Sequence, residues 1–81
     1  MDDVKHAEIY RQFLERLRTA REEAGLIQDQ VAEALGKPQS FVSKMESGER
    51  RLDLVEMEEI AELYGKSLEY FKSYRRDPGS N

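Results

Sequence analysis

The sequence predicts an all-α protein, folded as a compact five-helix domain. Apolar residues recur every three or four positions through most of the 81 residues, which is the spacing of one helix face. Gly25, Gly36, Gly48 and Gly65 each follow such a stretch, where glycine suits the left-handed conformation that commonly ends a helix. No segment shows the apolar–polar alternation of a half-buried strand. Short helices separated by tight glycine turns are therefore expected.

The first three helices are expected at about residues 4–24, 28–35 and 39–47. Apolar residues define their inward faces, namely Ile9, Phe13, Leu17, Ala20 and Ala24 in the first, Val31, Ala32 and Leu35 in the second, and Val42 and Met45 in the third. Ala32 supplies the small side chain that two closely crossing helices need. Gly36 allows the tight turn that joins them, because glycine tolerates a positive φ.

The fourth helix has the clearest start. Asp53 at the N-cap and Glu56 three residues later form a capping box, and Leu52 and Met57 are spaced to form the accompanying hydrophobic staple. After the glycine at the end of this helix, Ser67 is placed to cap a fifth helix with the sequence LEYFKSYR. These signals complete a chain of five helices.

Length and composition limit the other features. One domain is expected at residues 1–76, followed by a flexible tail at residues 77–81. The chain has no cysteine, which excludes disulfides and thiolate metal sites, and its one histidine, His6, has no neighbours suited to a metal. No metal or other cofactor is expected. Without an apolar run of membrane-spanning length or a signal peptide, the protein is expected in the cytoplasm, with no membrane partner.

The residue types do not favour an enzyme. The chain lacks a cysteine nucleophile and a glycine-rich phosphate loop, and its carboxylates fall on amphipathic helix surfaces. A domain of this size seldom encloses a catalytic cleft. No catalytic residue is therefore assigned.

Charge is distributed unevenly along the chain. The formal net charge is −4, which by itself argues against a nucleic-acid partner. However, residues 36–51 carry four basic and two acidic side chains, whereas residues 52–63 carry five acidic side chains and no basic one. Local fields matter more than the total, so a basic segment is followed by an acidic helix that should point away from phosphate.

The third expected helix has two unlike faces. Val42 and Met45 fall on one side of it. Polar side chains fall within an arc of roughly 140° on the other side, namely Gln39, Ser40, Ser43, Lys44 and Ser47. A helix with a buried face and a face of small polar side chains suits the major groove of DNA, where base edges present hydrogen-bond donors, acceptors and thymine methyl groups.

The segment from Leu17 to Phe71 resembles the Xre/Cro-type helix-turn-helix family, the lambda repressor-like DNA-binding domains. The agreement lies in the spacing of a whole set of landmarks, namely Arg21, Gly25-Leu26, Gln28, Ala32, Leu35-Gly36, Ser40, Val42-Ser43, Met45-Glu46, Gly48, Ile60-Ala61 and Ser67-Leu68. The resemblance implies a helix-turn-helix formed by the second and third helices. It also implies that the third helix is the recognition helix.

The resemblance implies a role for each polar residue of that helix. Gln39 takes the first base-reading position, where an amide can pair with adenine N6 and N7. Ser40 and Ser43 would contact bases or phosphates, and Lys44 a guanine or a phosphate.

Other roles carried over from the family lie outside the recognition helix. Gln28 corresponds to a phosphate-binding glutamine that opens the second helix, aided by backbone N–H groups there. Arg50 and Arg51 would meet the DNA backbone just past the recognition helix. Arg21 and Glu46 correspond to a structural pair that ties the first helix to the third.

Three residues depart from the family pattern. Ile27 stands where the family usually has Thr or Ser and cannot cap the second helix with its side chain. Pro38 stands where a small polar cap is usual and is interpreted as a first-turn proline. Phe41 is bulky at a position that is often small, and it packs either on a thymine methyl or sugar, or against the core.

Two functions remain open at this point. The first is a sequence-specific DNA-binding transcriptional regulator, a repressor or controller protein that binds a palindromic operator in double-stranded DNA as a homodimer. The alternative is a protein-interaction module of the same fold, such as an antitoxin that binds a partner protein and only secondarily DNA. Tyr70 and Tyr74 are assigned to the dimer interface, with Ile9 and Tyr10 of the first helix as the rival surface.

Overall fold

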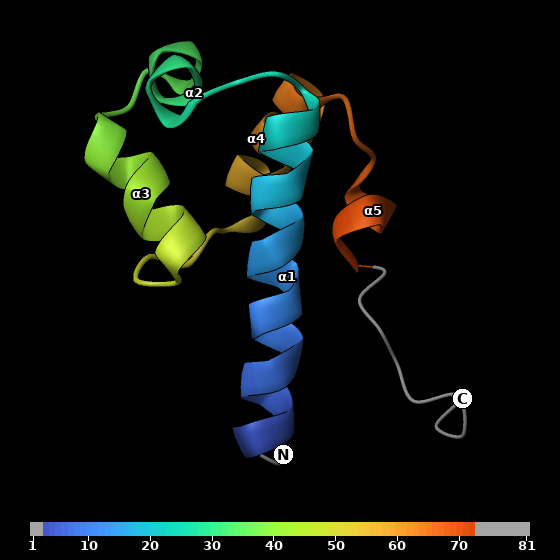
Figure 1. Cartoon of the computed structure of the whole chain (residues 1–81). Helices are drawn as coiled ribbons and strands as arrows, with labels where there is room; N and C mark the ends of the chain where they lie inside the picture. The colour runs from blue at the N-terminus through green and yellow to red at the C-terminus, as the bar shows by residue number, and fades with distance from the viewer. Residues whose placement is uncertain (1–2, 73–81) are drawn as a thin grey trace.

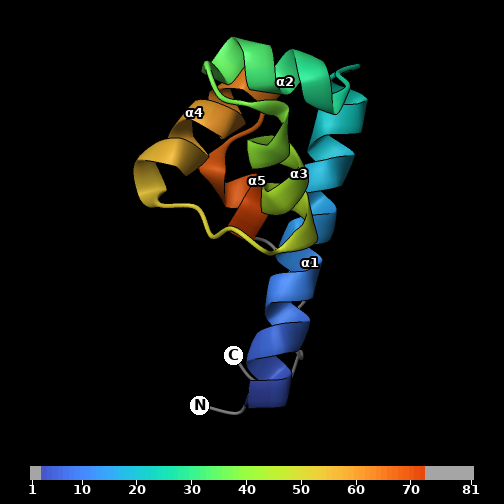
Figure 2. The same ribbon diagram turned by 90° about the vertical axis from the view of Figure 1, so that its left-hand side faces the viewer.

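The longest helix, α1 (Asp3–Glu23), runs along one side of the molecule, and its N-terminal half extends beyond the other helices (Figures 1 and 2). The structure is a computed structural model that describes residues 3–72. Four shorter helices complete this part of the chain, namely α2 (Gln28–Leu35), α3 (Gln39–Ser47), α4 (Leu54–Tyr64) and α5 (Leu68–Lys72). The expected all-α, five-helix architecture is confirmed. No helix among residues 3–72 is both long and apolar enough to cross a membrane.

The core lies where α1 meets the other helices, since α1 packs against α3, α4 and α5, and α2 packs against α3 and α4. Its buried apolar side chains are Leu17, Ala20, Val31, Ala32, Phe41, Val42, Met45, Met57, Ile60, Ala61, Tyr64 and Phe71. One side chain that the sequence placed on an inward face, Ala24, is exposed instead, since it follows the last residue of α1. Val55 of α4 is also exposed, whereas Ile60 on the same helix is fully buried.

The starts of α2 and α4 differ as their sequences require. At α4 both halves of the capping box are present: the Glu56 N–H donates to Asp53 Oδ1 at 2.8 Å, and the Asp53 N–H donates to Glu56 Oε1 at 3.0 Å. At α2 the Ile27 side chain offers no acceptor. Only the second hydrogen bond of a capping box remains, in which the Ile27 N–H donates to Gln30 Oε1 at 3.0 Å.

The start of α3 corrects one interpretation. Pro38 lies at the N-cap with φ −68° and ψ 156°, so it precedes the helix and does not form its first turn. The ring fixes φ near this value, which also suits an extended residue. The missing N–H costs nothing there, because the helix uses only the carbonyl of its N-cap residue. That carbonyl accepts the N–H of Phe41 at 2.9 Å.

Gly48 is required at the end of α3 for two reasons. Its φ is +88°, a conformation that residues with a side chain rarely adopt. A Cβ at this position would also lie 3.0 Å from Leu14 Cδ1 and 3.8 Å from Tyr10 Cε2, both on α1. Gly48 therefore lets the end of α3 approach α1 closely, which fixes where α3 sits on the molecule.

The last described helix, α5, begins as expected, since the Tyr70 N–H donates to Ser67 Oγ at 3.3 Å. Residues 73–75 of the expected fifth helix lie outside the described residues. The same is true of the remainder of the expected domain and of the tail assigned to residues 77–81.

Candidate nucleic-acid interface

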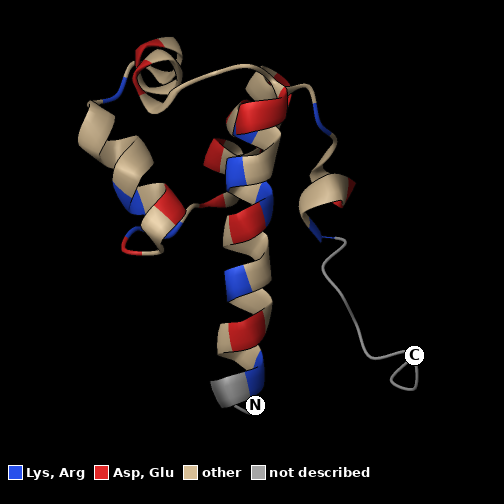
Figure 3. Cartoon of the chain, in the orientation of Figure 1, with Lys and Arg blue, Asp and Glu red and all other residues tan. Residues whose placement is uncertain are grey.

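The expected recognition face of α3 is open to solvent. Its exposed polar side chains are Gln39, Ser40, Ser43, Lys44 and Ser47. Val42 and Met45, on the opposite side of the helix, are fully buried. The first turn of α3 carries no charged residue (Figure 3). The structure thus brings the predicted base-reading residues together on one accessible helix face, held from behind by the core.

A chain of hydrogen bonds links this face to the interior. Gln39 Nε2 donates to Gln28 Oε1 at 2.8 Å, and Gln28 Nε2 donates to Glu46 Oε1 at 3.0 Å. The first bond joins the starts of α2 and α3. The sequence assigned both glutamines to DNA but gave no sign that they touch each other. Each amide keeps a further N–H and oxygen lone pairs for a ligand, since these bonds use only part of its capacity.

Glu46 also forms an ion pair with Arg21 of α1. The Arg21 Nε lies 2.6 Å from Glu46 Oε2, and Nη2 lies 3.1 Å from Oε1, so the pair is bidentate. The Arg21 Nη1 donates to the Leu26 carbonyl at 2.9 Å. The Glu46 side chain is only 2% exposed and that of Arg21 12% exposed. The hydrogen bond to Glu46 raises the pKa of Arg21, and burial, which opposes this, is the weaker effect.

Tyr64 of α4 lies near this pair but does not join it. Its hydroxyl is buried and has no hydrogen-bond partner among the described residues. Burial raises the pKa of Tyr64 to about 12, and the negative charge of Glu46 acts in the same direction. The phenol is therefore held neutral beside the ion pair.

Arg50, which the sequence assigned to the DNA backbone, makes its contacts within the protein. Its Nη1 and Nη2 lie 3.1 and 2.9 Å from the two carboxylate oxygens of Glu56. Hydrogen bonding raises the pKa of Arg50 and lowers that of Glu56. The pair connects the loop after α3 to the first turn of α4. The sequence indicated only a capping role for Glu56. The path of the loop between α3 and α4, which brings Arg50 to Glu56, has no local sequence signal.

Phe41 settles one of the two interpretations given above. Its side chain is 8% exposed and belongs to the core. The guanidinium carbon of Arg50 lies 4.5 Å from the centre of its ring, and Lys37 Nζ lies 5.4 Å from the same centre. Phe41 therefore packs against the core and supports two cations near the recognition helix.

Two further basic residues lie beside the recognition face. Lys44 is exposed and forms no ion pair within the described part of the chain. Arg51 is also exposed, and its guanidinium carbon lies 4.5 Å from the centre of the Tyr10 ring on α1. Such stacking leaves the donor edges of the guanidinium free for phosphate. Lys44 and Arg51 are thus exposed basic groups whose donors remain available to a ligand.

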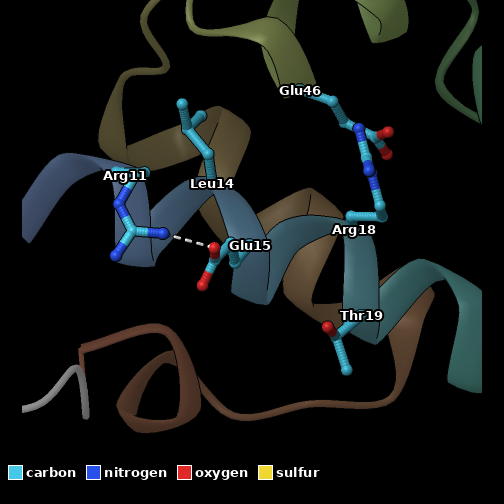
Figure 4. A pocket seen from close by; sticks show the side chains of 6 residues that line it. All are labelled: Arg11, Leu14, Glu15, Arg18, Thr19 and Glu46. Atoms are coloured by element: carbon cyan, nitrogen blue, oxygen red, sulfur yellow. Dashed lines mark hydrogen bonds and ion pairs between the residues drawn. The ribbon is translucent and has the colours of Figure 1, made fainter.

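A hollow of about 380 Å³ lies between α1 and α3 (Figure 4). Side chains of mixed charge line it, namely Arg11, Leu14, Glu15, Arg18, Thr19 and Glu46. Arg11 and Glu15 form an ion pair along α1, and Arg11 also pairs with Glu8. Its lining therefore combines charged side chains with one apolar residue, Leu14, and one hydroxyl, that of Thr19.

Tyr70, one of the two residues assigned to a dimer interface, is half-buried on α5. Its ring meets that of Phe71 edge to face, with centres 5.0 Å apart. The guanidinium of Arg16 and the ammonium of Lys66 lie 5.3 and 4.6 Å from its centre. Tyr70 therefore already has neighbours within the monomer. Tyr74 lies outside the described residues.

Known proteins resemble the chain over the same elements. A helix-turn-helix family model matches residues 17–71, from the middle of α1 to α5. No curated protein sequence matches the chain. The solved structure of an XRE-family like protein from Pseudomonas syringae pv. tomato str. DC3000 is 40% identical and superposes with a TM-score of 0.78, covering 86% of this chain and 85% of that chain. With the helix-turn-helix at α2 and α3, these matches show that the chain belongs to the Xre/Cro-type helix-turn-helix family of DNA-binding domains.

Proposed function

We propose that the protein is a sequence-specific transcriptional regulator, a repressor or controller protein that binds a palindromic operator as a homodimer. The observation that carries the proposal is the hydrogen-bonded series from Gln39 through Gln28 and Glu46 to Arg21. It fixes the start of the recognition helix against α2 and α1. A base-reading side chain held by its neighbours loses less entropy on binding, which favours specific recognition.

Each group at the face has a role in this proposal. Gln39, Ser40 and Ser43 read base edges in the major groove, and the backbone N–H groups at the start of α2, with Gln28, hold a phosphate. Lys44 and Arg51 supply positive charge along the DNA backbone. Arg50 stays on Glu56 and acts through the loop after α3.

A dimer is proposed because the surface that one copy offers to DNA is small. One recognition helix and a few phosphate contacts give weak binding, so two copies reading half-sites about one helical turn apart are expected. As a regulator of transcription, the protein would act in the cytoplasm.

The experiment is selection of binding sites from a random pool of duplex DNA by the purified protein. A palindromic consensus is expected, and its affinity should fall as salt rises with a slope set by the phosphates contacted. Recovery of no consensus would contradict sequence-specific binding. Binding that occurs only after a partner protein is added would favour the alternative, a protein-interaction module that binds DNA secondarily.

A further inference from the structure

A groove of about 330 Å³ lies between the C-terminal end of α2 and the outer side of α4. Its lining combines three apolar with two acidic side chains, namely Ala34, Leu35, Leu63, Glu59 and Glu62. Leu35 and Leu63 are half-buried and pack against the core, so the floor is apolar and firmly held. The two glutamates are exposed and form its rim. We call this feature the α2–α4 groove.

Exposed aliphatic side chains lie on the same helix, one to two turns before the rim. Val55 is 63% exposed and Leu54 66% exposed, and Ile27 is the third large apolar residue that is exposed among those described. Val55 precedes Glu59 by four residues, so it lies directly beside the rim on the helix surface. An exposed apolar side chain such as Val55 beside an apolar groove is typical of a protein-binding surface.

The two charged side chains that line the groove, Glu59 and Glu62, are both negative. Residues 52–63 carry five carboxylates and no basic residue. Glu58 and Glu62 are four apart on α4, which places like charges side by side and destabilises the helix. Within the described residues, Glu58, Glu59 and Glu62 form no ion pair. A surface that keeps unpaired, mutually repelling carboxylates beside apolar groups is complementary to cations that carry apolar side chains.

We propose that the α2–α4 groove, extended by Val55, is a docking site for a basic amphipathic helix of a partner protein. An apolar side chain of that helix enters the groove between Leu35 and Leu63. Lysine or arginine residues three or four positions away on the same helix pair with Glu59 and Glu62. This is recognition of a helix by a groove, with charge selecting the partner.

The site is separate from the proposed DNA interface. Gln28 opens α2, whereas the groove uses the last two residues of that helix, about 10 Å further along its axis. α3 does not contribute to the lining. A partner helix in the groove therefore leaves the recognition face open, and the two kinds of binding can be measured independently.

The experiment is a nuclear magnetic resonance titration of isotope-labelled full-length protein with synthetic helical peptides of about 14 residues, or four turns. One peptide places leucines on one face and lysines on the other. A second has glutamate in place of lysine, and a third has the first composition in an order that gives no apolar face. Only the first is expected to bind, with shifts confined to α4 and the C-terminal end of α2.

Variants of the protein test the residues. Glu62→Lys should weaken binding of the basic peptide at least about tenfold, because like charges would then meet. It should still fold, because lysine is favourable near the C-terminus of a helix. The matched control is Glu22→Lys, the same change at an exposed position on α1, with an effect below about twofold. Val55→Ser should weaken binding without altering the preference for lysine over glutamate.

Several results of these experiments would overturn the proposal. They are equal binding of the lysine and glutamate peptides, equal effects of Glu62→Lys and Glu22→Lys, shifts centred on α1 or α3, and no binding up to about 1 mM peptide. If the protein self-associates and Glu62→Lys abolishes that association, the occupant of the groove is a second copy of the chain. That result would overturn the proposal of a partner helix. The proposed function is tested separately, by measuring DNA affinity. DNA affinity should be the same with and without the peptide, because the two ligands bind different surfaces.

Discussion

Glu46 belongs to α3, yet it accepts hydrogen bonds from Arg21 on α1 and from Gln28 on α2. A single buried carboxylate therefore holds three helices at fixed angles. The cost of burying its charge is offset only while both donors remain. Loss of the carboxylate would leave the largely buried guanidinium of Arg21 without its ion-pair partner, so the effect of a substitution should exceed that of a surface ion pair.

Glu46→Ala is expected to lower the free energy of unfolding by about 1–3 kcal/mol. Urea denaturation measures this, with Glu22→Ala, an exposed residue of α1, as the control that should change little. DNA affinity should fall as a consequence, since the recognition helix is less firmly held. An unchanged unfolding midpoint for Glu46→Ala would remove the structural role of the pair.

Tyr64 gives a prediction that depends on pH. Its pKa is raised from 10.0 to about 12 in the folded protein, mainly by burial. Between these values the folded protein keeps the phenolic proton while the unfolded chain has lost it, so stability should fall as pH rises from 10 to 12. Tyr64→Phe should remove this component of alkaline unfolding. At neutral pH it should leave stability unchanged or raise it by up to ~1 kcal/mol, because the hydroxyl has no partner.

The measurement is thermal unfolding of both proteins at a series of pH values. Every other ionisable group is the same in both proteins, so the difference between them isolates the contribution of the Tyr64 hydroxyl. If the two proteins lose stability in parallel between pH 10 and 12, the hydroxyl of Tyr64 is not the group that resists ionisation.

At the scale of elements, helix ends were predicted better than long-range contacts. The bounds of α2 and α3 agree with the sequence, because glycine punctuation and helical apolar spacing are local signals. The same holds for the capping box at Asp53. Pro38 was misplaced by one position, since an N-cap proline and a first-turn proline have the same φ and differ only in ψ.

The contacts that the sequence could not predict join residues far apart in the helices or on either side of a loop. The bond between Gln39 and Gln28 joins two helix starts, and the pair of Arg50 with Glu56 closes a loop. Both contacts depend on interhelical geometry and have no local pattern. Family resemblance assigned the glutamines and Arg50 to DNA but did not indicate their contacts within the protein. A basic residue after a recognition helix has the same sequence signature in either role.

Gly48 tests how α3 is placed against α1. Gly48→Ala should destabilise the protein by about 1–3 kcal/mol, because a side chain at φ +88° is strained and Leu14 must shift to make room. Gly36→Ala is the matched control, with φ +68° and nothing within 4 Å of an added Cβ. Gly36→Ala has the conformational strain without the steric contact, so it should lower the free energy of unfolding by less than Gly48→Ala does.

Chemical denaturation of the two variants measures the difference. Equal losses for Gly48→Ala and Gly36→Ala would mean that the close approach of α3 to α1 contributes nothing. In that case the position of the recognition helix would depend on the ion pair of Glu46 and on the core.

At the scale of the whole molecule, the proposed dimer would place two recognition helices on one DNA duplex. Tyr70 already packs against Phe71 and under two cations, so an interface near it would use the outer part of its ring together with Tyr74. Aromatic residues suit such an interface, because they add contact area at low entropy cost. Tyr74→Asp should shift the protein toward the monomer in sedimentation experiments.

The same measurement includes Tyr70→Asp and, for the rival surface on α1, Ile9→Asp. Tyr70→Asp is interpreted only if circular dichroism shows a folded protein, since the ring also packs within the monomer. A folded Tyr74→Asp variant that remains fully dimeric would place the interface elsewhere. Loss of the dimer in Ile9→Asp would then assign it to the first helix.

The central claim is that α3 reads base sequence, and the affinity of Gln39→Ala for its selected site and for random duplex DNA tests it most directly. On the selected site the variant should lose roughly 1–3 kcal/mol of binding free energy and accept other bases at one position of each half-site. On random DNA its affinity should stay unchanged, because phosphate contacts dominate there. Equal losses on both kinds of DNA would contradict a base-reading role for Gln39.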